Sequence, residues 1–332
     1  MLNRFFDLDK RTLLFAVPLV MIALLVVVAP PILIFHYLEE NALYLMLTYL
    51  LLGLTLFLMG KPRSMFISFA CCALLCYTLQ ERSACSLDWA EEGDGSQIKV
   101  AHFDLDVLSV QTDSILTTIA GVDADIISIQ GLHTEHFSPL HATLTSAGYP
   151  FYQSSNTVPN PPGLIVYSKS PFSFVKKVSH AGASAVAGKI ETGQPDDFHF
   201  VGVYFSAVVD IDAYSELQRQ MQALGFQTNK IDEPLLVFGN YNLKPWSKAI
   251  QQYKSLSQLR NSRRGVQPTQ PHGYFPLGDH FSDHIFYSNH FKCISFETIS
   301  CGSEPHLGIC GTFERVNNAQ DKRGDQKTGT EL

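Results

Sequence analysis

Apolar residues along this chain follow two patterns: long runs near the N-terminus and short runs everywhere else. The long runs cover residues 13–35, 42–59 and 65–79. Because a helix needs roughly 20 apolar residues to cross a bilayer, we expect three transmembrane helices within a membrane domain of residues 1–82. Each run could instead be a buried core helix, or the first a signal peptide, but no small-residue cleavage site follows it.

Charged residues beside the long runs predict an orientation. Cytoplasmic loops of membrane proteins are enriched in Lys and Arg. Glu39 and Glu40 occupy the first connection, whereas basic residues precede the first run and follow the second: Arg4, Lys10, Arg11, Lys61 and Arg63. We therefore expect a multi-pass protein of the plasma (inner) membrane whose part after Gln80 is extracytoplasmic. If the third run does not span, that part is cytoplasmic.

The short runs indicate an α/β domain over residues 98–315. It follows a linker at 83–97, rich in Glu, Gly and Ser, and precedes a polar tail at 316–332 that we expect to be disordered. Helical spacing of apolar residues predicts helices at 107–120 and 214–226. Short apolar runs predict strands at 98–103, 126–129, 149–154, 163–168, 172–178, 198–207, 235–238 and 285–287.

Charge opposes one class of partner. After Cys85 the chain has 18 Lys and Arg against 26 Asp and Glu, a net charge of −8. Nucleic acid is therefore not a favoured ligand, because sequence-independent binding depends on basic residues that neutralise phosphates. A local basic cluster remains at Arg260, Arg263 and Arg264, which we interpret as a solvated loop or helix face.

Seven cysteines give no sign of a metal site. Three lie in the third apolar run and one in the linker; Cys293, Cys301 and Cys310 lie near the end of the domain. No pair has the spacing of a structural zinc site. An oxidising compartment would permit one disulfide among the last three, and free buried thiols are the alternative.

The end of the apolar run at 235–238 is the first candidate for chemistry. Asn240 and Asn242 are two residues apart, so on an extended backbone their side chains point to the same face. Gly239 lacks the Cβ that would hold a ligand away. This strand end could bind a phosphate, or it could be an ordinary turn.

Six segments in a shared order carry a resemblance. They are VAHFDLD (100–106), ADIISIQGLH (124–133), GLIVYSKSPF (163–172), PLLVFGNYNLKPWS (234–247), SDHIFYS (282–288) and GSEPHLGICGTF (302–313). Together they resemble the endonuclease/exonuclease/phosphatase superfamily, in a membrane-anchored bacterial form. Members of this superfamily cleave phosphodiesters or phosphomonoesters with a divalent metal. The resemblance implies a two-sheet α/β sandwich flanked by helices.

The resemblance also implies catalytic residues. Asp283 matches the Asp that orients the catalytic His, and His306 matches that His. Asn242 matches the Asn that contacts phosphate, while Asn240 stands where a water-orienting Asp is expected. Tyr204 could donate a hydrogen bond to phosphate or simply pack as a strand aromatic.

Two positions expected to bind the metal differ from the family pattern. Gly131 stands where the principal metal-binding carboxylate is expected, and Asp104 stands in place of an Asn. Mg²⁺ or Mn²⁺ prefers oxygen ligands, so Asp104 or Glu135 would be the substitute metal ligands if the domain is active. With an amide at 240, we predict a catalytically impaired binding or scaffold module for a phosphate-containing ligand, its protein partner unidentified. The alternative is a metal-dependent phosphodiesterase, nuclease or phosphatase with substitute ligands.

Overall fold

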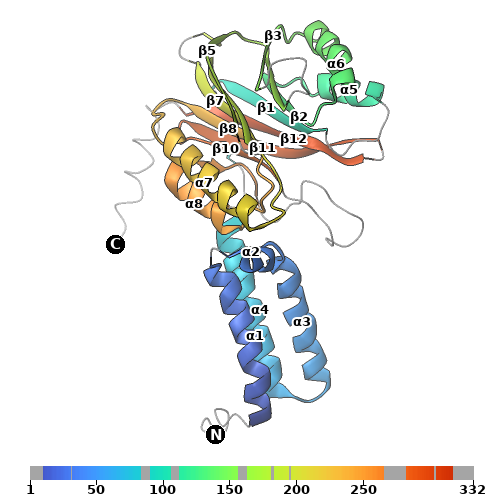
Figure 1. The fold of residues 1–332 in the computed structure, drawn as a ribbon, viewed down its shortest axis with the longest axis vertical. Coiled ribbons are helices and arrows are strands. Elements are labelled where there is room, and N and C mark those ends of the chain that lie inside the picture. Colours follow the sequence, from blue (N-terminus) through green and yellow to red (C-terminus); the bar gives the residue numbers. More distant parts are fainter. Residues whose placement is uncertain are drawn as a thin grey trace.

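The computed structural model describes residues 10–30, 32–83, 90–105, 112–155, 163–180, 183–193, 196–264, 282–302 and 304–316. These residues form two bodies stacked end to end, a slender helical bundle at the N-terminal end and a larger β-rich body (Figure 1). The expected disorder at 317–332 lies outside the described residues.

The bundle is built from four helices. Helices α1 (Lys10–Val28), α3 (Ala42–Leu58) and α4 (Pro62–Ser83) run lengthwise, while α2 (Leu33–Glu40) lies across the end nearest the β-rich body (Figure 1). Helix α1 is followed by Ala29, which has a φ of 43°, and by two prolines. Proline lacks the N–H that a continuing helix needs. The first expected span is therefore broken into α1 and α2, bent by 96°.

The bundle helices differ in their capacity to cross a membrane. Among the described residues, α4 alone is long and apolar enough, and the bent pair of α1 and α2 is a second candidate if it counts as one span. Helix α3 has 17 residues and is classed with the shorter apolar helices. Three spans therefore remain a prediction.

The described strands of the β-rich body form two six-stranded sheets. The first has the order β11-β12-β1-β2-β4-β3, and the second has the order β5-β6-β7-β8-β10-β9. Both are mixed, because β1 is parallel to β2 and β7 is parallel to β8 while their other neighbours are antiparallel. The strands are β1 (Gln97–Asp104), β2 (Ile126–Gln130), β3 (Phe151–Ser154), β4 (Leu164–Ser168), β5 (Phe172–His180), β6 (Ala183–Ile190), β7 (Phe198–Phe205), β8 (Leu235–Asn240), β9 (Arg260–Asn261), β10 (Asp283–Tyr287), β11 (Phe291–Cys301) and β12 (Glu304–Arg315).

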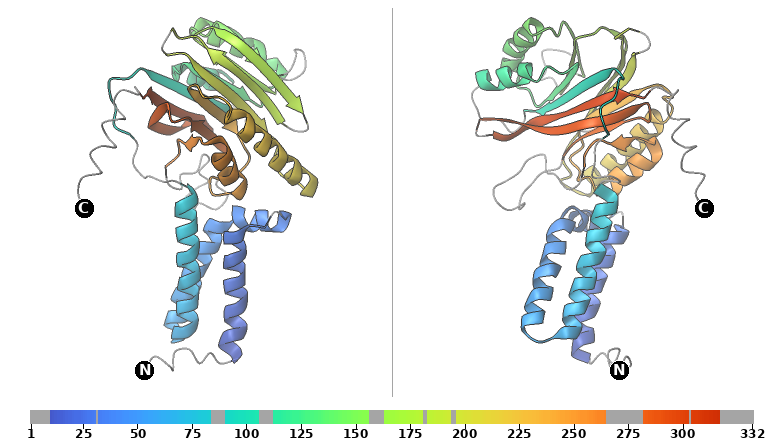
Figure 2. Two further views of the ribbon diagram at one scale, coloured as in Figure 1. Left: turned by 90° about the vertical axis from the view of Figure 1, so that its left-hand side faces the viewer. Right: turned by 180° about the vertical axis from the view of Figure 1, so that it is seen from behind.

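The sheets pack face to face and are covered by helices on their outer faces (Figure 2). Side chains such as Val166, Phe200 and Phe238 fill the space between the sheets. Helices α5 (Thr112–Gly121) and α6 (Thr134–Ser146) pack on the first sheet, and α7 (Ile211–Thr228) and α8 (Lys248–Ser257) pack on the second. The predicted two-sheet α/β sandwich flanked by helices is confirmed.

Sequence patterns missed several elements. Helix α6 contains Pro139, which we would not place inside a helix, and α8 is short, polar and capped by the Ser247 hydroxyl. Strands β6 and β11 carry many partly exposed positions and lack the continuous apolar runs that identified other strands. The predicted helix at 107–120 is described from Thr112 onward, and its earlier residues lie outside the described part.

Part of the expected linker is fastened to the β-rich body. The backbone N–H groups of Gly93 and Gly95 donate to the Glu314 carboxylate at 2.7 and 3.2 Å, and the Ala90 N–H donates to the Cys293 carbonyl at 3.1 Å.

Cys293, Cys301 and Cys310 are buried free thiols. Of the two alternatives for these cysteines, the structure shows the unbridged one.

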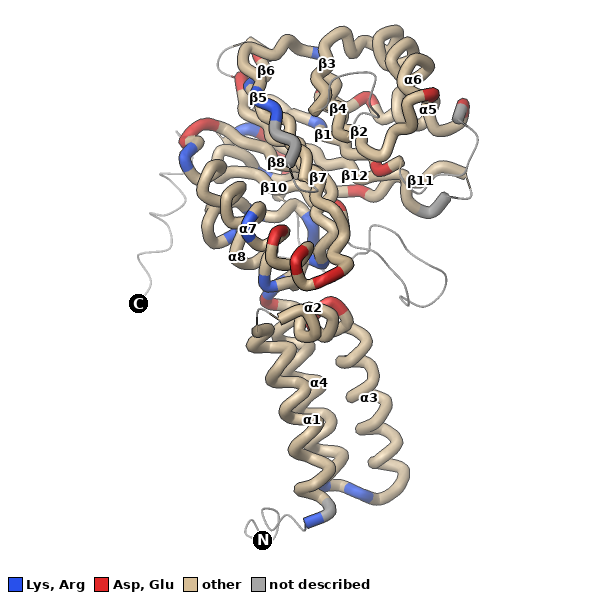
Figure 3. The backbone as a smooth tube through the Cα atoms, in the orientation of Figure 1, with Lys and Arg blue, Asp and Glu red and all other residues tan. Residues whose placement is uncertain are grey.

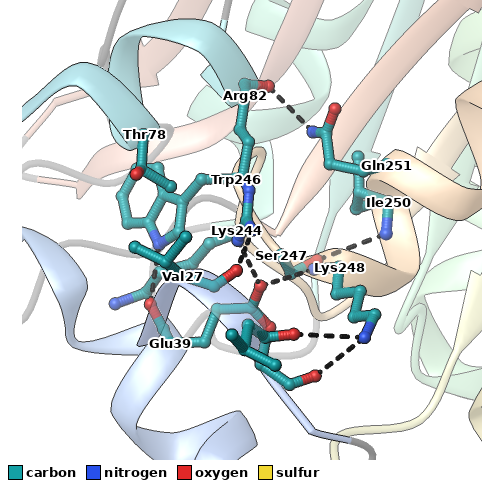
Figure 4. A network of polar contacts seen from close by, with 12 residues as sticks. Val27, Glu39, Thr78, Arg82, Lys244, Trp246, Ser247, Lys248, Ile250 and Gln251 are labelled. Atoms are coloured by element: carbon teal, nitrogen blue, oxygen red, sulfur yellow. Dashed lines mark hydrogen bonds and ion pairs between the residues drawn. The ribbon is translucent and has the colours of Figure 1, made fainter. Parts of the chain in front are cut away.

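The loop between β8 and α8 docks on the top of the bundle (Figure 4). Trp246 is 1% exposed and packs with Ala23, Val26 and Leu75. Its indole N–H donates to the Glu39 carbonyl at 2.9 Å.

Charged and polar groups surround the tryptophan. The Glu39 carboxylate accepts hydrogen bonds from Arg82 at 3.0 Å and from the Lys248 N–H at 2.7 Å. Gln251 of α8 donates to the Arg82 carbonyl at 2.8 Å. The bundle and the sandwich are therefore joined by buried contacts at this junction.

Candidate functional site

The end of β8 is shaped by a glycine. Gly239 has a φ of 147°, and a Cβ at this position would collide with the carbonyl oxygen of Val203 on neighbouring β7. The sequence suggested that Gly239 makes room for a ligand. That interpretation is wrong, because the space is filled by the backbone of the next strand.

Asn240 links the two sheets. Its side-chain amide donates to a carboxylate oxygen of Asp104, at the end of β1, over 2.8 Å. Within its own sheet, Asn240 pairs with Tyr204 on β7 and with Asp283 on β10. The structure therefore brings Asp104, Tyr204, Asn240 and Asp283 to one rim, where the sheets meet.

Asn242 does not continue the strand. It has a φ of 49°, and its N–H donates to the Asn240 side-chain oxygen at 2.7 Å. Its side-chain amide donates to the Phe205 carbonyl at 2.5 Å. The expectation that Asn240 and Asn242 point to one face of an extended strand is therefore wrong, because the chain turns between them.

Asp283 and His306 form the second link between the sheets. The His306 Nε2 lies 2.7 Å from the Asp283 Oδ2, and these side chains are 8% and 0% exposed. Burial alone would raise the pKa of Asp283, but its hydrogen bond to His306 and its electrostatic interactions with His306, His102 and Arg263 lower it overall. An ionised Asp283 thus holds the imidazole in one orientation.

His102, Ser128 and Gln130 are site residues that sequence reasoning did not assign. His102 on β1 is fully buried, with Nδ1 at 3.1 Å from the Ser128 hydroxyl and Nε2 at 3.9 Å from Asp283. Burial lowers the pKa of His102 to about 4, so the ring is neutral at pH 7. A polar residue inside the apolar run at 98–103 was the signal that could have found it.

Gln130 ends β2 beside Asp104. It is 1% exposed, and neither polar atom of its side-chain amide has a hydrogen-bond partner in the described structure; the same is true of the His306 Nδ1. Buried polar groups are normally paired. These atoms, together with the His102 Nε2, therefore have unused hydrogen-bonding capacity at this rim.

Arg263 supports the site from behind. It was expected in a solvated face, but its side chain is fully buried and its Nη2 donates to the Asp283 carbonyl at 2.7 Å. Its guanidinium lies over the Phe296 ring, 5.1 Å from the centroid. Burial lowers its pKa to about 10, with Asp283 opposing the shift, so it stays protonated at pH 7.

The residues at this rim do not fit the divalent metal site that the sequence resemblance implies. Gly131 offers no side chain, and Glu135 sits in the first turn of α6 with 78% of its side chain exposed, 3.6 Å from His136. Asp104 is hydrogen-bonded to Asn240. Among the described residues, no group of three or more His, Cys, Asp or Glu side chains could hold a metal ion.

A family comparison bears directly on this arrangement. Residues 105–305, well over half of the chain, match the Endonuclease/Exonuclease/phosphatase family. The chain belongs to this family. Asp283, Asn240 and Tyr204 lie inside the matched range, whereas Asp104 and His306 flank it by one residue on either side. A search of curated proteins finds no match.

Solved structures of the Endonuclease/Exonuclease/phosphatase family share the fold. The catalytic domain of human Nocturnin, solved with a bound sulfate anion, aligns with a TM-score of 0.54 at 17% identity, over 69% of this chain and 97% of that one. A family protein from Beutenbergia cavernae gives 0.53 at 16% identity, over 67% and 72%. Another from Bacteroides thetaiotaomicron gives 0.52 at 15% identity, over 68% and 100%. At these identities the likeness concerns the fold.

Proposed function

We propose that this chain is a membrane-anchored binding module of the Endonuclease/Exonuclease/phosphatase family, which takes a phosphate-containing ligand at the rim and hydrolyses it poorly. The observation that carries the proposal is the hydrogen bond from the Asn240 amide to Asp104. At position 240 the resemblance expects a carboxylate that orients water, and an amide cannot accept a proton. The bond also engages the carboxylate best placed to substitute as a metal ligand.

The rim keeps features suited to binding. Gln130 offers a buried side-chain N–H group that no protein atom accepts, and the His306 Nδ1 also lacks a partner in the described structure. Tyr204 brings a phenol to the same rim. The side-chain N–H of Gln130 and the phenol O–H of Tyr204 are donors that can pair with phosphate oxygens, which accept hydrogen bonds strongly. Binding therefore remains possible where the acidic groups needed for turnover are missing.

Three features of the bundle support membrane anchoring. At about 1.5 Å per residue, the 22 residues of α4 extend about 33 Å, close to the thickness of a hydrocarbon core. Leu14, Leu51 and Leu58 are 78%, 64% and 84% exposed on the bundle. Lys10 begins α1, and Lys61 and Arg63 flank the start of α4, so all three lie at the end of the bundle where Figure 3 shows basic segments far from the β-rich body. Since basic residues favour the cytoplasmic side, we infer that the sandwich lies outside the cytoplasm.

A second function is favoured by one observation. The Asp283–His306 pair has the 2.7 Å geometry of a working acid–base pair, which a pure binding module does not need. The alternative is therefore a phosphodiesterase, nuclease or phosphatase that recruits Mg²⁺ or Mn²⁺ through substitute ligands.

Hydrolysis assays on the full chain in uncharged detergent separate the two functions. We expect little turnover of bis(p-nitrophenyl) phosphate or p-nitrophenyl phosphate with Mg²⁺ or Mn²⁺. Gly131→Glu and Asn240→Asp should each gain little, whereas the double variant should gain about 100-fold, because a base and its metal act as a unit. Gly131 has a φ of 68°, which disfavours a side chain by about 1–2 kcal/mol, so the variant's melting temperature must be checked.

His306→Ala provides the control. Added to the double variant it should abolish the gained activity, because the imidazole would no longer face the reacting phosphate. Robust hydrolysis by the unmodified chain, removed by both chelation and His306→Ala, would refute the impaired module and establish the alternative.

A further inference from the structure

A cavity lies at the opposite end of β8 from the candidate site. It has a volume of about 1110 Å³ and is lined by the ends of α4, α7 and α8, by β9 with the residues that follow it, and by the turn after β10. Its lining includes Ser288, whose hydroxyl accepts a hydrogen bond from the Leu235 N–H at the start of β8. A volume of this size accommodates a small organic ligand.

The described lining of this cavity is basic. It contains Lys254, Arg260, Arg263 and Arg264, with Asp232 as its one carboxylate. The surrounding part of the chain is acidic, with a net charge of −8 after Cys85. The basic cluster seen in the sequence is therefore gathered around a cavity. Such a concentration of positive charge attracts anions.

The basic groups are held in place. The Arg264 Nη1 donates to the carbonyls of Asn261 and Ser262 at 3.1 and 3.4 Å, and the Lys254 Nζ donates to the Gln251 side chain at 3.3 Å. A guanidinium fixed in this way loses little freedom when it binds an oxyanion, and its fork matches phosphate geometry.

Ser83 provides an independent sign of a ligand. It is the last residue of α4, is 2% exposed, lines the cavity, and has a hydroxyl with no hydrogen-bond partner in the described structure. We propose that this cavity binds a phosphate-bearing anion through Lys254, Arg260 and Arg264, with the Ser83 hydroxyl as a further donor.

Two sources could supply such an anion. Because α4 is the best candidate for a membrane span, a cavity that reaches its last residue lies where the headgroup of an anionic phospholipid would be found. A soluble phosphate ester has the same recognisable group. Only the lipid source depends on the membrane anchoring proposed above.

Calorimetric titration of the full chain in an uncharged detergent tests the proposal, with inorganic phosphate and short-chain phosphatidic acid as probes. The titrations are made in the His306→Ala background, which removes one of the rim side chains proposed above to face phosphate. We expect saturable binding whose dissociation constant rises about tenfold in Lys254→Gln/Arg260→Gln, because charge-assisted hydrogen bonds are lost. Arg264→Gln should weaken binding in the same direction.

Lys176→Gln/Lys177→Gln is the matched control, because it removes the same charge from exposed positions on β5. Binding of phosphatidic acid alone would identify a lipid headgroup as the source, and binding of both probes or of phosphate alone would show that a soluble anion suffices. Absence of binding by either probe, or equal weakening in the control variant, would overturn the proposal. The rim function is judged separately, by hydrolysis.

Discussion

Two side-chain hydrogen bonds join the sheets at the candidate site. Asn240 of β8 reaches Asp104 of β1, and Asp283 of β10 reaches His306 of β12. Each pair takes one partner from each sheet, so these residues fix the spacing of the rim as well as its chemistry. In the low-dielectric interior such bonds are strong, and the loss of one partner is costly.

Asp283 should make stability depend on pH. Its pKa is lowered in the folded chain, so the ionised form contributes stability above the ordinary value of about 4, and this contribution is lost as the pH falls through the lowered pKa. Asp283→Asn should cost about 3 kcal/mol of unfolding free energy at pH 7. The difference from the unmodified chain should shrink below pH 4 in denaturant titrations.

The exposed Asp94 offers a control for this experiment. Asp94→Asn should change stability little at any pH. A loss in Asp283→Asn that stays constant from pH 7 to pH 3 would show that the side chain acts through its shape and not through its charge.

Sequence motifs identified part of the site, and the remaining features became visible only in the structure. Asp104, Asn240, Asp283 and His306 were found because each stands at a strand end or within a recognisable segment, and the structure brings them to one rim. Their roles remain predictions. The turn at Asn242 and the burial of Arg263 depend on backbone angles and on neighbouring strands, which a linear pattern does not contain.

At the scale of elements, β8 organises the domain. It is buried along its whole length, ends at the candidate site, and leads into the loop that carries Trp246 to the bundle. Gly239 allows β8 to lie against β7 at this point. The position of the rim therefore depends on one residue without a side chain.

Gly239→Ala should be strongly destabilising. The new Cβ would meet the Val203 carbonyl at a φ of 147°, and backbone strain of this kind costs about 1–3 kcal/mol before any clash is counted. Thermal unfolding should show a clear drop in the melting temperature. Gly121→Ala, where nothing lies within 4 Å of the added Cβ, should leave the melting temperature nearly unchanged. A neutral Gly239→Ala would mean that β7 and β8 can separate there.

Elements were predictable from the sequence where burial was uniform. Strands β2, β4, β8 and β10 are buried throughout and appear as short, mostly apolar runs. Helix α8 buries one face against the second sheet and exposes the other, so its ten polar-rich residues give a weak signal. Helix α6 was missed because Pro139 disfavours a helix in isolation, although its packing on the first sheet compensates.

At the scale of the molecule, charge is separated along the long axis. Basic residues mark one end of the bundle, and Glu39 and Glu40 mark the other, beside the sandwich (Figure 3). Three lengthwise helices then carry the chain from the basic end to the sandwich (Figure 1). This arrangement suits an odd number of membrane crossings. The lengths of α1 and α2 alone do not indicate that number, because a break separates the two helices.

A reporter active only outside the cytoplasm, fused after Leu332, should be active. The same reporter fused after Lys61, at the basic end between α3 and α4, should be inactive, because basic loops stay in the cytoplasm. Activity of a cytoplasm-only reporter after Leu332 would show that α4 does not cross and that the sandwich lies inside.

The burial of Trp246 in the bundle gives the junction its own optical signal. The chain has two tryptophans, so in a Trp89→Phe chain all indole fluorescence would come from Trp246. A ring that is 1% exposed should emit at short wavelength, and release of the sandwich from the bundle should shift the emission to the red. A fragment without residues 1–83 would show the red-shifted spectrum from the start, since the surface that encloses the indole would be missing.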